Sequence, residues 1–196
     1  MIVLASASAT RAAMLERAGL YVQREAARID EGEIKREFQR RRGEAAACAM
    51  ALAEAKALDV AARHSGALVI GADQLLACGS LWLDKPRDRD DARTQLLELR
   101  GRTHELATAA CVVRDNAVMW RTIETPRLAM RAFSNAFLDF YLDGIGREDL
   151  GAVGAYRIEG LGVQLFARIE GDYFSILGLP LLPLLDFFRA QGEIAP

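Results

Sequence analysis

The sequence predicts an α/β fold built on a mixed β-sheet. Short apolar runs, typical of buried strands, alternate along the chain with longer segments that carry helix-capping residues. In the middle of the chain, two long apolar segments flank the turn Arg114-Asp115-Asn116, which indicates a β-hairpin. Alternating strands and helices favour parallel pairing, whereas a hairpin requires antiparallel pairing, so we expect both in one sheet.

Helices are predicted where a capping residue precedes a helix-forming stretch and a glycine follows it. In chain order they cover residues 8–18, 43–63, 90–99, 134–142 and 180–191. Ser8 and Ser134 are suited to cap their helices. Pro180 is suited to the start of the last helix, where the N–H that proline lacks has no helical partner. The acidic segment 30–33 is predicted to be a loop.

Strands are predicted from short apolar runs bounded by turn residues. They cover residues 2–5, 67–72, two short segments within 75–83, 104–113, 118–132, 162–169 and 173–177. The run at 67–72 matters most, because Asp73 follows it directly and is therefore expected at the end of a strand.

Composition narrows the classes of function. With 196 residues, the chain is long enough for one domain, predicted over 1–196, or for two small lobes. A net charge of −2 gives no reason to expect binding to a nucleic-acid polymer or to a membrane surface. No apolar run reaches the roughly 18 residues of a membrane-spanning helix. Cys48, Cys78 and Cys111 lack paired spacing, and the start of the chain does not resemble a signal peptide, so a cytoplasmic location is expected.

The turn Ser6-Ala7-Ser8-Ala9-Thr10-Arg11 is a candidate phosphate site. It leads from a strand into a helix, and the free N–H groups at a helix start favour anions. Arg11 lies in the first helical turn, where the helix dipole disfavours a cation, and a bound phosphate would reverse that penalty. The alternative is an ordinary serine cap with Arg11 reaching into solvent or pairing locally.

Asp73 and Gln74 are candidates for catalysis and base recognition. A carboxylate after a buried strand could bind a divalent cation or act as a general base, or it could simply form a turn. The amide of Gln74 could recognise the edge of a base, since it has both a donor and an acceptor, or it could be a polar loop residue.

Three more charged residues could complete such a site. Lys85, held extended by Pro86, could neutralise phosphate. Lys56 lies among apolar residues of its helix, so it either reaches solvent along its stem or meets an anion. Glu31 could add a carboxylate for a metal, or it could be solvated. Farther along, Glu159 is flanked by small residues, where a ligand could approach closely.

These segments, in this order, resemble the Maf family of nucleoside triphosphate pyrophosphatases over nearly the whole chain. The matching segments are Leu4 to Arg11, Asp73, Lys85-Pro86, Gly101 with His104 and Thr108, and Gly154 to Leu181. The resemblance implies an elongated α/β domain whose mixed sheet is flanked by helices, with two lobes around a nucleotide cleft, often as a homodimer.

The resemblance also implies an activity and roles for residues. The expected reaction is hydrolysis of a nucleoside triphosphate to a monophosphate and pyrophosphate, with Mg²⁺ or Mn²⁺ as the divalent cation. Asp73 would be the base or a metal ligand, and Glu31 would be the second acidic group near the metal. The residues implied to hold the triphosphate are Ser6, Arg11, Lys56 and Lys85.

Four positions are predicted to bind the rest of the substrate, namely Ser8, Thr10, Gln74 and Glu159. Asp73-Gln74 and Glu159-Gly160 are similar to the branch that acts on 7-methyl-GTP, whereas the branch selective for dTTP and UTP has Asp-Thr and Gln-Gly there. The chain departs from the family at Ala9, where a proline is usual, and at Thr10, often Arg or Trp. A carboxylate at Glu159 could accept from the N–H groups of guanine and meet the positive charge of the methylated ring.

Two alternatives stay open on the sequence. One is a pyrophosphatase for dTTP and UTP, or a broad house-cleaning enzyme for several nucleotides. The other is a nucleotide-binding regulator of septation without important turnover.

Overall fold

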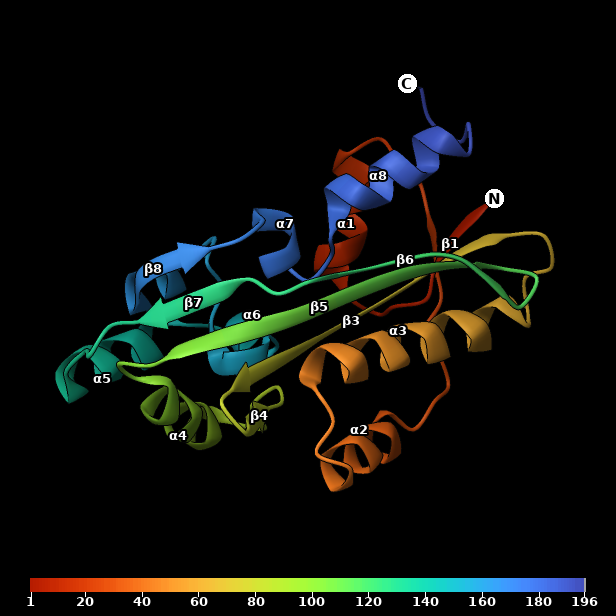
Figure 1. Ribbon diagram of the computed structural model, residues 1–196. Helices are drawn as coiled ribbons and strands as arrows, with labels where there is room; N and C mark the ends of the chain where they lie inside the picture. The colour runs from red at the N-terminus through yellow and green to blue at the C-terminus, as the bar shows by residue number, and fades with distance from the viewer. Residues whose placement is uncertain (196) are drawn as a thin grey trace. The chain divides into compact units, whose positions relative to one another are not determined.

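The computed structural model describes residues 1–195, without the side chains of residues 147 and 148, and it confirms the predicted α/β class (Figure 1). The strands are β1 Ile2–Leu4, β2 Gln23–Arg24, β3 Leu68–Cys78, β4 Leu81–Leu83, β5 Thr103–Arg114, β6 Ala117–Glu124, β7 Arg127–Met130 and β8 Phe166–Glu170. The α-helices are α1 Ala9–Arg17, α2 Glu31–Arg40, α3 Ala45–Ala61, α4 Arg89–Leu99, α5 Asn135–Gly144, α6 Arg147–Leu150, α7 Tyr173–Ile176 and α8 Leu181–Ala190. Two 3₁₀ helices, Val153–Ala155 and Leu161–Leu165, complete the elements.

The sheet is mixed, as predicted. Its strand order is β2-β1-β3-β5-β7-β8, with β4 paired to β3 and β6 paired to β5. β1 pairs in parallel with β2 and β3, whereas the β3–β4, β5–β6, β5–β7 and β7–β8 pairs are antiparallel. The chain divides into two compact units. Unit 1 comprises Met1–Gln74, Ala107–Thr125 and Asp172–Pro196, and unit 2 comprises Leu75–Leu106 and Pro126–Gly171. That one domain covers 1–196 stays a prediction.

In unit 1, helices cover both faces of β3. Leu68, Ile70 and Ala72 belong to a core cluster with residues of α1 and α8. Because successive side chains of a strand point to opposite faces, Val69, Gly71 and Asp73 share the other face. Figure 1 shows α3 on that face, across the strands from α1 and α8. The two faces of β3 therefore meet different helices, and neighbouring residues of β3 have different surroundings.

α3 packs unusually close to β3 at Gly71. A Cβ atom at this position would lie 2.1 Å from the carbonyl oxygen of Ala53 and 2.8 Å from the Cβ of Ala57. Only a glycine on the strand, facing alanines on the helix, allows this approach. The alanine-rich composition of α3 therefore has a packing role as well as a high helix propensity.

Three of the predicted helix starts are confirmed, two of them by a serine cap. The Ser8 hydroxyl accepts a hydrogen bond from the Arg11 amide at 3.3 Å, and the Ser134 hydroxyl accepts one from the Phe137 amide at 3.1 Å. α8 begins directly after Pro180, as predicted. These caps satisfy N–H groups that the helices themselves leave unpaired.

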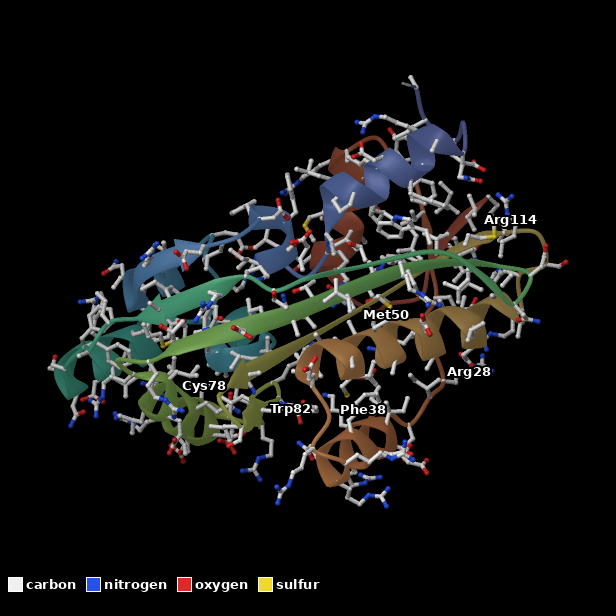
Figure 2. The ribbon with its side chains drawn as sticks, in the orientation of Figure 1. Arg28, Phe38, Met50, Cys78, Trp82 and Arg114 are labelled. Carbon is white, nitrogen blue, oxygen red and sulfur yellow. The ribbon has the colours of Figure 1, made fainter. Side chains whose placement is uncertain are left out.

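The prediction of an acidic loop at 30–33 is wrong. Asp30 caps α2 by accepting a hydrogen bond from the Glu33 amide at 2.8 Å, so Glu31 and Glu33 lie in the first helical turn. Acidic side chains are favoured there by the helix dipole. Figure 2 labels Phe38, which points from α2 toward α3.

Two strand predictions are also wrong. β3 does not end at residue 72 but continues to Cys78, so Asp73 and Gln74 lie inside the strand. The predicted strand at 173–177 is the short helix α7, because the Asp172 carboxylate accepts a hydrogen bond from the Ser175 amide at 2.7 Å and caps it. The predicted strands at 118–132 and 162–169 are only partly formed. The first is split into β6 and β7, and the second begins as a 3₁₀ helix.

Unit 2 contains a buried histidine at the start of β5. His104 is fully buried, and its Nε2 lies 2.7 Å from the Tyr156 hydroxyl. Its Nδ1 is also buried and has no hydrogen-bond partner within the described part of the chain. Burial lowers the pKa of His104 to about 4, because the charged ring is disfavoured away from water. The ring is therefore neutral at physiological pH.

No helix within residues 1–195 has the length and apolar character that crossing a membrane requires.

We expect His104 to make the stability of the protein depend on pH. The pKa of His104 is lowered from 6.5 to about 4 in the fold, so within this window the unfolded chain binds more protons than the folded chain. The free energy of unfolding should therefore fall as the pH drops below 6.5, by up to about 1.4 kcal/mol per pH unit. Urea unfolding at several pH values measures this slope.

His104→Gln is the comparison for that measurement, since an amide can still meet the Tyr156 hydroxyl and does not titrate. Carboxylates contribute equally to the pH dependence of the unfolding free energy in both proteins, so the difference between the two profiles isolates the contribution of His104. The same pH dependence in both proteins would contradict a lowered pKa of His104.

Candidate active site

A lysine and two carboxylates gather on the α3 face of unit 1. Lys56 Nζ donates a hydrogen bond to Asp73 Oδ1 at 2.5 Å and lies 3.0 Å from Glu31 Oε1. Lys56 is 8% exposed and Asp73 is 6% exposed, whereas Glu31 is open to solvent. Of the two readings of Lys56, the structure therefore shows the one in which it meets anions. Two negative charges and one positive charge leave the cluster with a net charge of −1.

The spacing of the two elements explains this meeting. Asp73 is two residues after Gly71, so both point to the same face of β3. Lys56 is three residues after Ala53, so both lie on the same face of α3. The close contact at Gly71 and Ala53 therefore brings the ammonium group of Lys56 to the carboxylate of Asp73.

Asp73 and Glu31 are the residues of this cluster that could hold a divalent cation, with substrate oxygens as further ligands. No group of three or more His, Cys, Asp and Glu side chains that could hold a metal ion is found among the described residues. Mg²⁺ is commonly held by one or two carboxylates, and waters and substrate phosphates complete its shell. Asp73 and Glu31 provide two carboxylates, and Lys56 contacts one oxygen of each.

The Ser6–Arg11 turn lies in the same unit, and Arg11 is firmly held there. Arg11 Nε donates to the Gly178 carbonyl at 2.7 Å, and Nη1 donates to the Ala72 carbonyl at 2.9 Å and to Ser6 Oγ at 3.3 Å. Burial lowers the pKa of Arg11, while the charges of Asp73 and Glu31 raise it. The guanidinium keeps its charge. Arg11 therefore does not reach into solvent. It pairs locally with Ser6, as the alternative allowed, and also with the distant Ala72 and Gly178 carbonyls.

Arg11 also takes the place of a missing strand. The pairing of β1 with β3 ends at Leu4 and Ile70, and the Ala5 amide still donates to the Ile70 carbonyl at 2.8 Å. The next carbonyl on that edge belongs to Ala72, and it accepts from Arg11 instead of from a strand. The guanidinium therefore lies at an edge of β3 that β1 leaves uncovered.

Gln74 lies on the opposite face of β3 from Asp73, as strand geometry requires. Its Nε2 donates to Thr108 Oγ1 at 2.8 Å and to the carbonyls of Ser175 at 2.9 Å and Ile176 at 3.2 Å. Gln74 is thus a fixed residue of the sheet and not a polar residue of a loop, as one reading of the sequence allowed.

The remaining predicted site residues are less constrained. Ser8 serves as the cap of α1, and Thr10 is half-buried in its first turn. Lys85 and Glu159 belong to unit 2. Lys85 is exposed shortly after β4, and Glu159 Oε1 accepts a hydrogen bond from Arg157 Nη2 at 3.0 Å. Their roles in a site stay predictions.

Sequence reasoning gave no role to Gly71, Thr108 or Arg157, although each contacts or positions a candidate residue. A glycine inside an apolar strand often marks a close backbone approach, so Gly71 could have been found by that signal. Thr108 was matched to the family segment with Gly101 and His104 but received no role, and Arg157 had no local signal, because an arginine near a carboxylate is common.

The fold and the site define an α/β protein with a lysine-paired carboxylate and a serine-capped helix start in the same unit. The sequence comparisons then identify the family. The family described as Maf-like protein matches residues 1–191. The chain belongs to the Maf family, as its motifs predicted.

Curated relatives match over almost their full length. The chain is 52% identical over 194 residues to the nucleoside triphosphate pyrophosphatase of Paramagnetospirillum magneticum, covering 99% of this chain and 100% of that protein. It is 48% identical over 193 residues to a protein of the same name from Granulibacter bethesdensis, covering 98% of both. It is 47% identical over 194 residues to the 7-methyl-GTP pyrophosphatase of Rhizobium meliloti, covering 99% of this chain and 98% of that protein.

We expect Gly71→Ala to disturb the site through packing alone. The added methyl group would meet the Ala53 carbonyl at 2.1 Å, so α3 must move away and carry Lys56 from Asp73. Overpacking of this kind costs about 1–3 kcal/mol. Thermal unfolding should show a lower Tm, and any turnover should fall although no charged group is changed.

Gly146→Ala is the matched control, because a Cβ there meets nothing within 4 Å. Unchanged stability and turnover in Gly71→Ala would show that the close approach of α3 is not required.

Proposed function

We propose that this protein hydrolyses a nucleoside triphosphate to a monophosphate and pyrophosphate, with 7-methyl-GTP and related guanine nucleotides preferred. The pyrophosphatase class is supported by full-length relatives that carry this name. The base preference is supported by Gln74 and Glu159 and by the relative named 7-methyl-GTP pyrophosphatase.

The observation that carries the proposal is the pairing of Asp73 with Lys56. The buried Lys56 fixes Oδ1 of the Asp73 carboxylate, and Glu31 lies beside the same ammonium group. Such a carboxylate has a defined orientation before substrate binds, which is what a general base or a metal ligand requires.

In the proposed reaction, water attacks the α-phosphorus and the bond to the β-phosphate oxygen breaks. Asp73 accepts the proton of that water, or it ligates the cation. Lys56 and Arg11 stabilise the negative charge that develops on the phosphate oxygens. The contacts of Arg11 with the protein use Nε and Nη1, so we assign Nη2 to the triphosphate. Ser6 and the Ala9 and Thr10 amides at the start of α1 would complete the phosphate contacts, since the Arg11 amide is engaged by Ser8.

The cation would be held by Asp73 and Glu31 together with phosphate oxygens. When bound, it would neutralise phosphate charge and polarise the phosphorus centre. The same two residues would stay in place without it, because Lys56 pairs with both carboxylates.

We propose that the substrate binds at the edge of β3 that β1 leaves unpaired, beside Arg11. Asp73 and Gln74 point to opposite faces, and Arg11 lies between them at the Ala72 carbonyl. A nucleotide that crosses this edge could contact Asp73 with its phosphates and Gln74 with its base. Glu159 is proposed to contact the base as well. The homodimer, the cytoplasmic location and a house-cleaning role stay predictions.

We expect Asp73→Asn to lose turnover by a factor of about 10³ or more while nucleotide binding persists. Asparagine has nearly the same shape but can neither accept the proton nor attract a cation strongly. Pyrophosphate release with Mg²⁺ or Mn²⁺ measures turnover, and calorimetry measures nucleotide binding. Asp186→Asn on α8, which removes only an exposed pairing with Arg189, is the control.

The outcomes separate the open alternatives. Loss of turnover with retained binding supports the enzyme. If the wild-type protein binds triphosphates but releases no pyrophosphate from 7-methyl-GTP, GTP, dTTP, UTP, CTP or ITP, the protein is a nucleotide-binding regulator instead.

We expect Gln74→Thr combined with Glu159→Gln to shift preference from guanine nucleotides toward UTP and dTTP. The change replaces both proposed base-contacting groups by those of the other branch, and it removes the carboxylate that would favour a cationic base. The ratio of kcat/KM for 7-methyl-GTP and UTP measures the shift. An unchanged ratio in an active, folded variant would defeat the assignment of these residues as base contacts.

A further inference from the structure

The side-chain amide of Gln74 is held by three acceptors within unit 1. Nε2 lies 2.8 Å from Thr108 Oγ1, 2.9 Å from the Ser175 carbonyl and 3.2 Å from the Ile176 carbonyl. Thr108 and Ser175 are fully buried. The amide is therefore fixed between β3, β5 and α7, the elements that carry Gln74, Thr108 and Ser175.

The chemistry of these partners decides which way the amide points. The two backbone carbonyls can only accept hydrogen bonds. Thr108 Oγ1 donates its own hydrogen to the Ser175 carbonyl at 2.9 Å, so it too is an acceptor toward Gln74. An amide oxygen in this position would face three acceptors, which is strongly unfavourable. The NH₂ group must therefore point to Thr108 and α7, and the carbonyl oxygen Oε1 must point away.

We propose that Thr108 and the two carbonyls make Gln74 an acceptor-only contact for the base, so that the site selects bases with a ring N–H. This inference rests on the proposed function and deepens it. A free glutamine can rotate its amide to match either a donor or an acceptor. Here rotation would leave the buried Thr108 and Ser175 groups facing an oxygen, so Oε1 alone meets the ligand.

The bases differ clearly at this point. Guanine, uracil and thymine have a ring N–H on the base-pairing edge, whereas adenine and cytosine have a bare ring nitrogen, which is an acceptor. Oε1 attracts a ring N–H and repels a bare ring nitrogen. Methylation of guanine at N7 leaves the N1–H in place, so 7-methyl-GTP satisfies the same rule. Thr108 is then a positioning residue, since it acts on the base only through Gln74.

The test compares nucleotides that differ in the ring N–H and gain no bulk. GTP is compared with the triphosphate of 2-aminopurine riboside, which lacks the N1–H and O6, and UTP is compared with CTP. For the wild-type protein we expect the N–H nucleotide of each pair to be favoured at least about tenfold in kcat/KM, mainly through KM. Thr108→Val should lower this discrimination several-fold with little change in kcat, and Thr108→Ser should restore it.

Two further variants complete the experiment. Thr122→Val is the matched control, because Thr122 lies on β6 outside these contacts. Gln74→Met removes the amide altogether and should lower the discrimination at least as far as Thr108→Val does, which keeps the test available if Thr108→Val does not fold.

The inference and the proposed function fail in different ways. Wild-type turnover of all four nucleotides without discrimination overturns the acceptor-only role and leaves the pyrophosphatase intact. If no nucleotide is turned over, the proposed function fails, and the same ratios are measured as Kd by calorimetry. Equal Kd values within each pair would then overturn the inference as well.

Discussion

The close contact between Gly71 on β3 and Ala53 on α3 determines the geometry of the candidate site. Because the helix backbone lies so near the strand, the residue one turn farther along α3 meets the residue two positions farther along β3. Those residues are Lys56 and Asp73. The pair is buried, so its orientation is set by packing and does not depend on flexible side chains in solvent. Arg11 and Glu31 are then arranged around a carboxylate that is already fixed.

The helix ends could be predicted because caps are local. Ser8, Ser134 and Pro180 act within a few residues of their own positions, and the structure confirms all three. Aspartates were harder to interpret, because the same side chain forms turns, caps helices and pairs with distant lysines. Asp30 caps a helix where a loop was predicted. Asp172 caps α7, whose four residues are too few to show a helical period.

The sequence predicted which residues belong to the candidate site, but it did not predict the contacts that they make. Asp73 was expected at a strand end, yet it lies inside β3, since Lys56 compensates its charge there. The orientation of Gln74 depends on Ser175, 101 positions away along the chain, and no local pattern reports such a partner. The family resemblance gave the residue types, and only the fold shows which atoms of each residue are already engaged.

The position of Arg11 also bears on how the protein behaves at high concentration. An uncovered strand edge presents backbone groups to which a second chain can add a strand, and this is a common origin of aggregation. The backbone carbonyl of Ala72 on this edge already accepts a hydrogen bond from the charged guanidinium of Arg11. A charged side chain is one of the devices by which natural sheets discourage such pairing. Arg11 therefore disfavours the addition of a strand from another chain to the unpaired edge of β3 at Ala72.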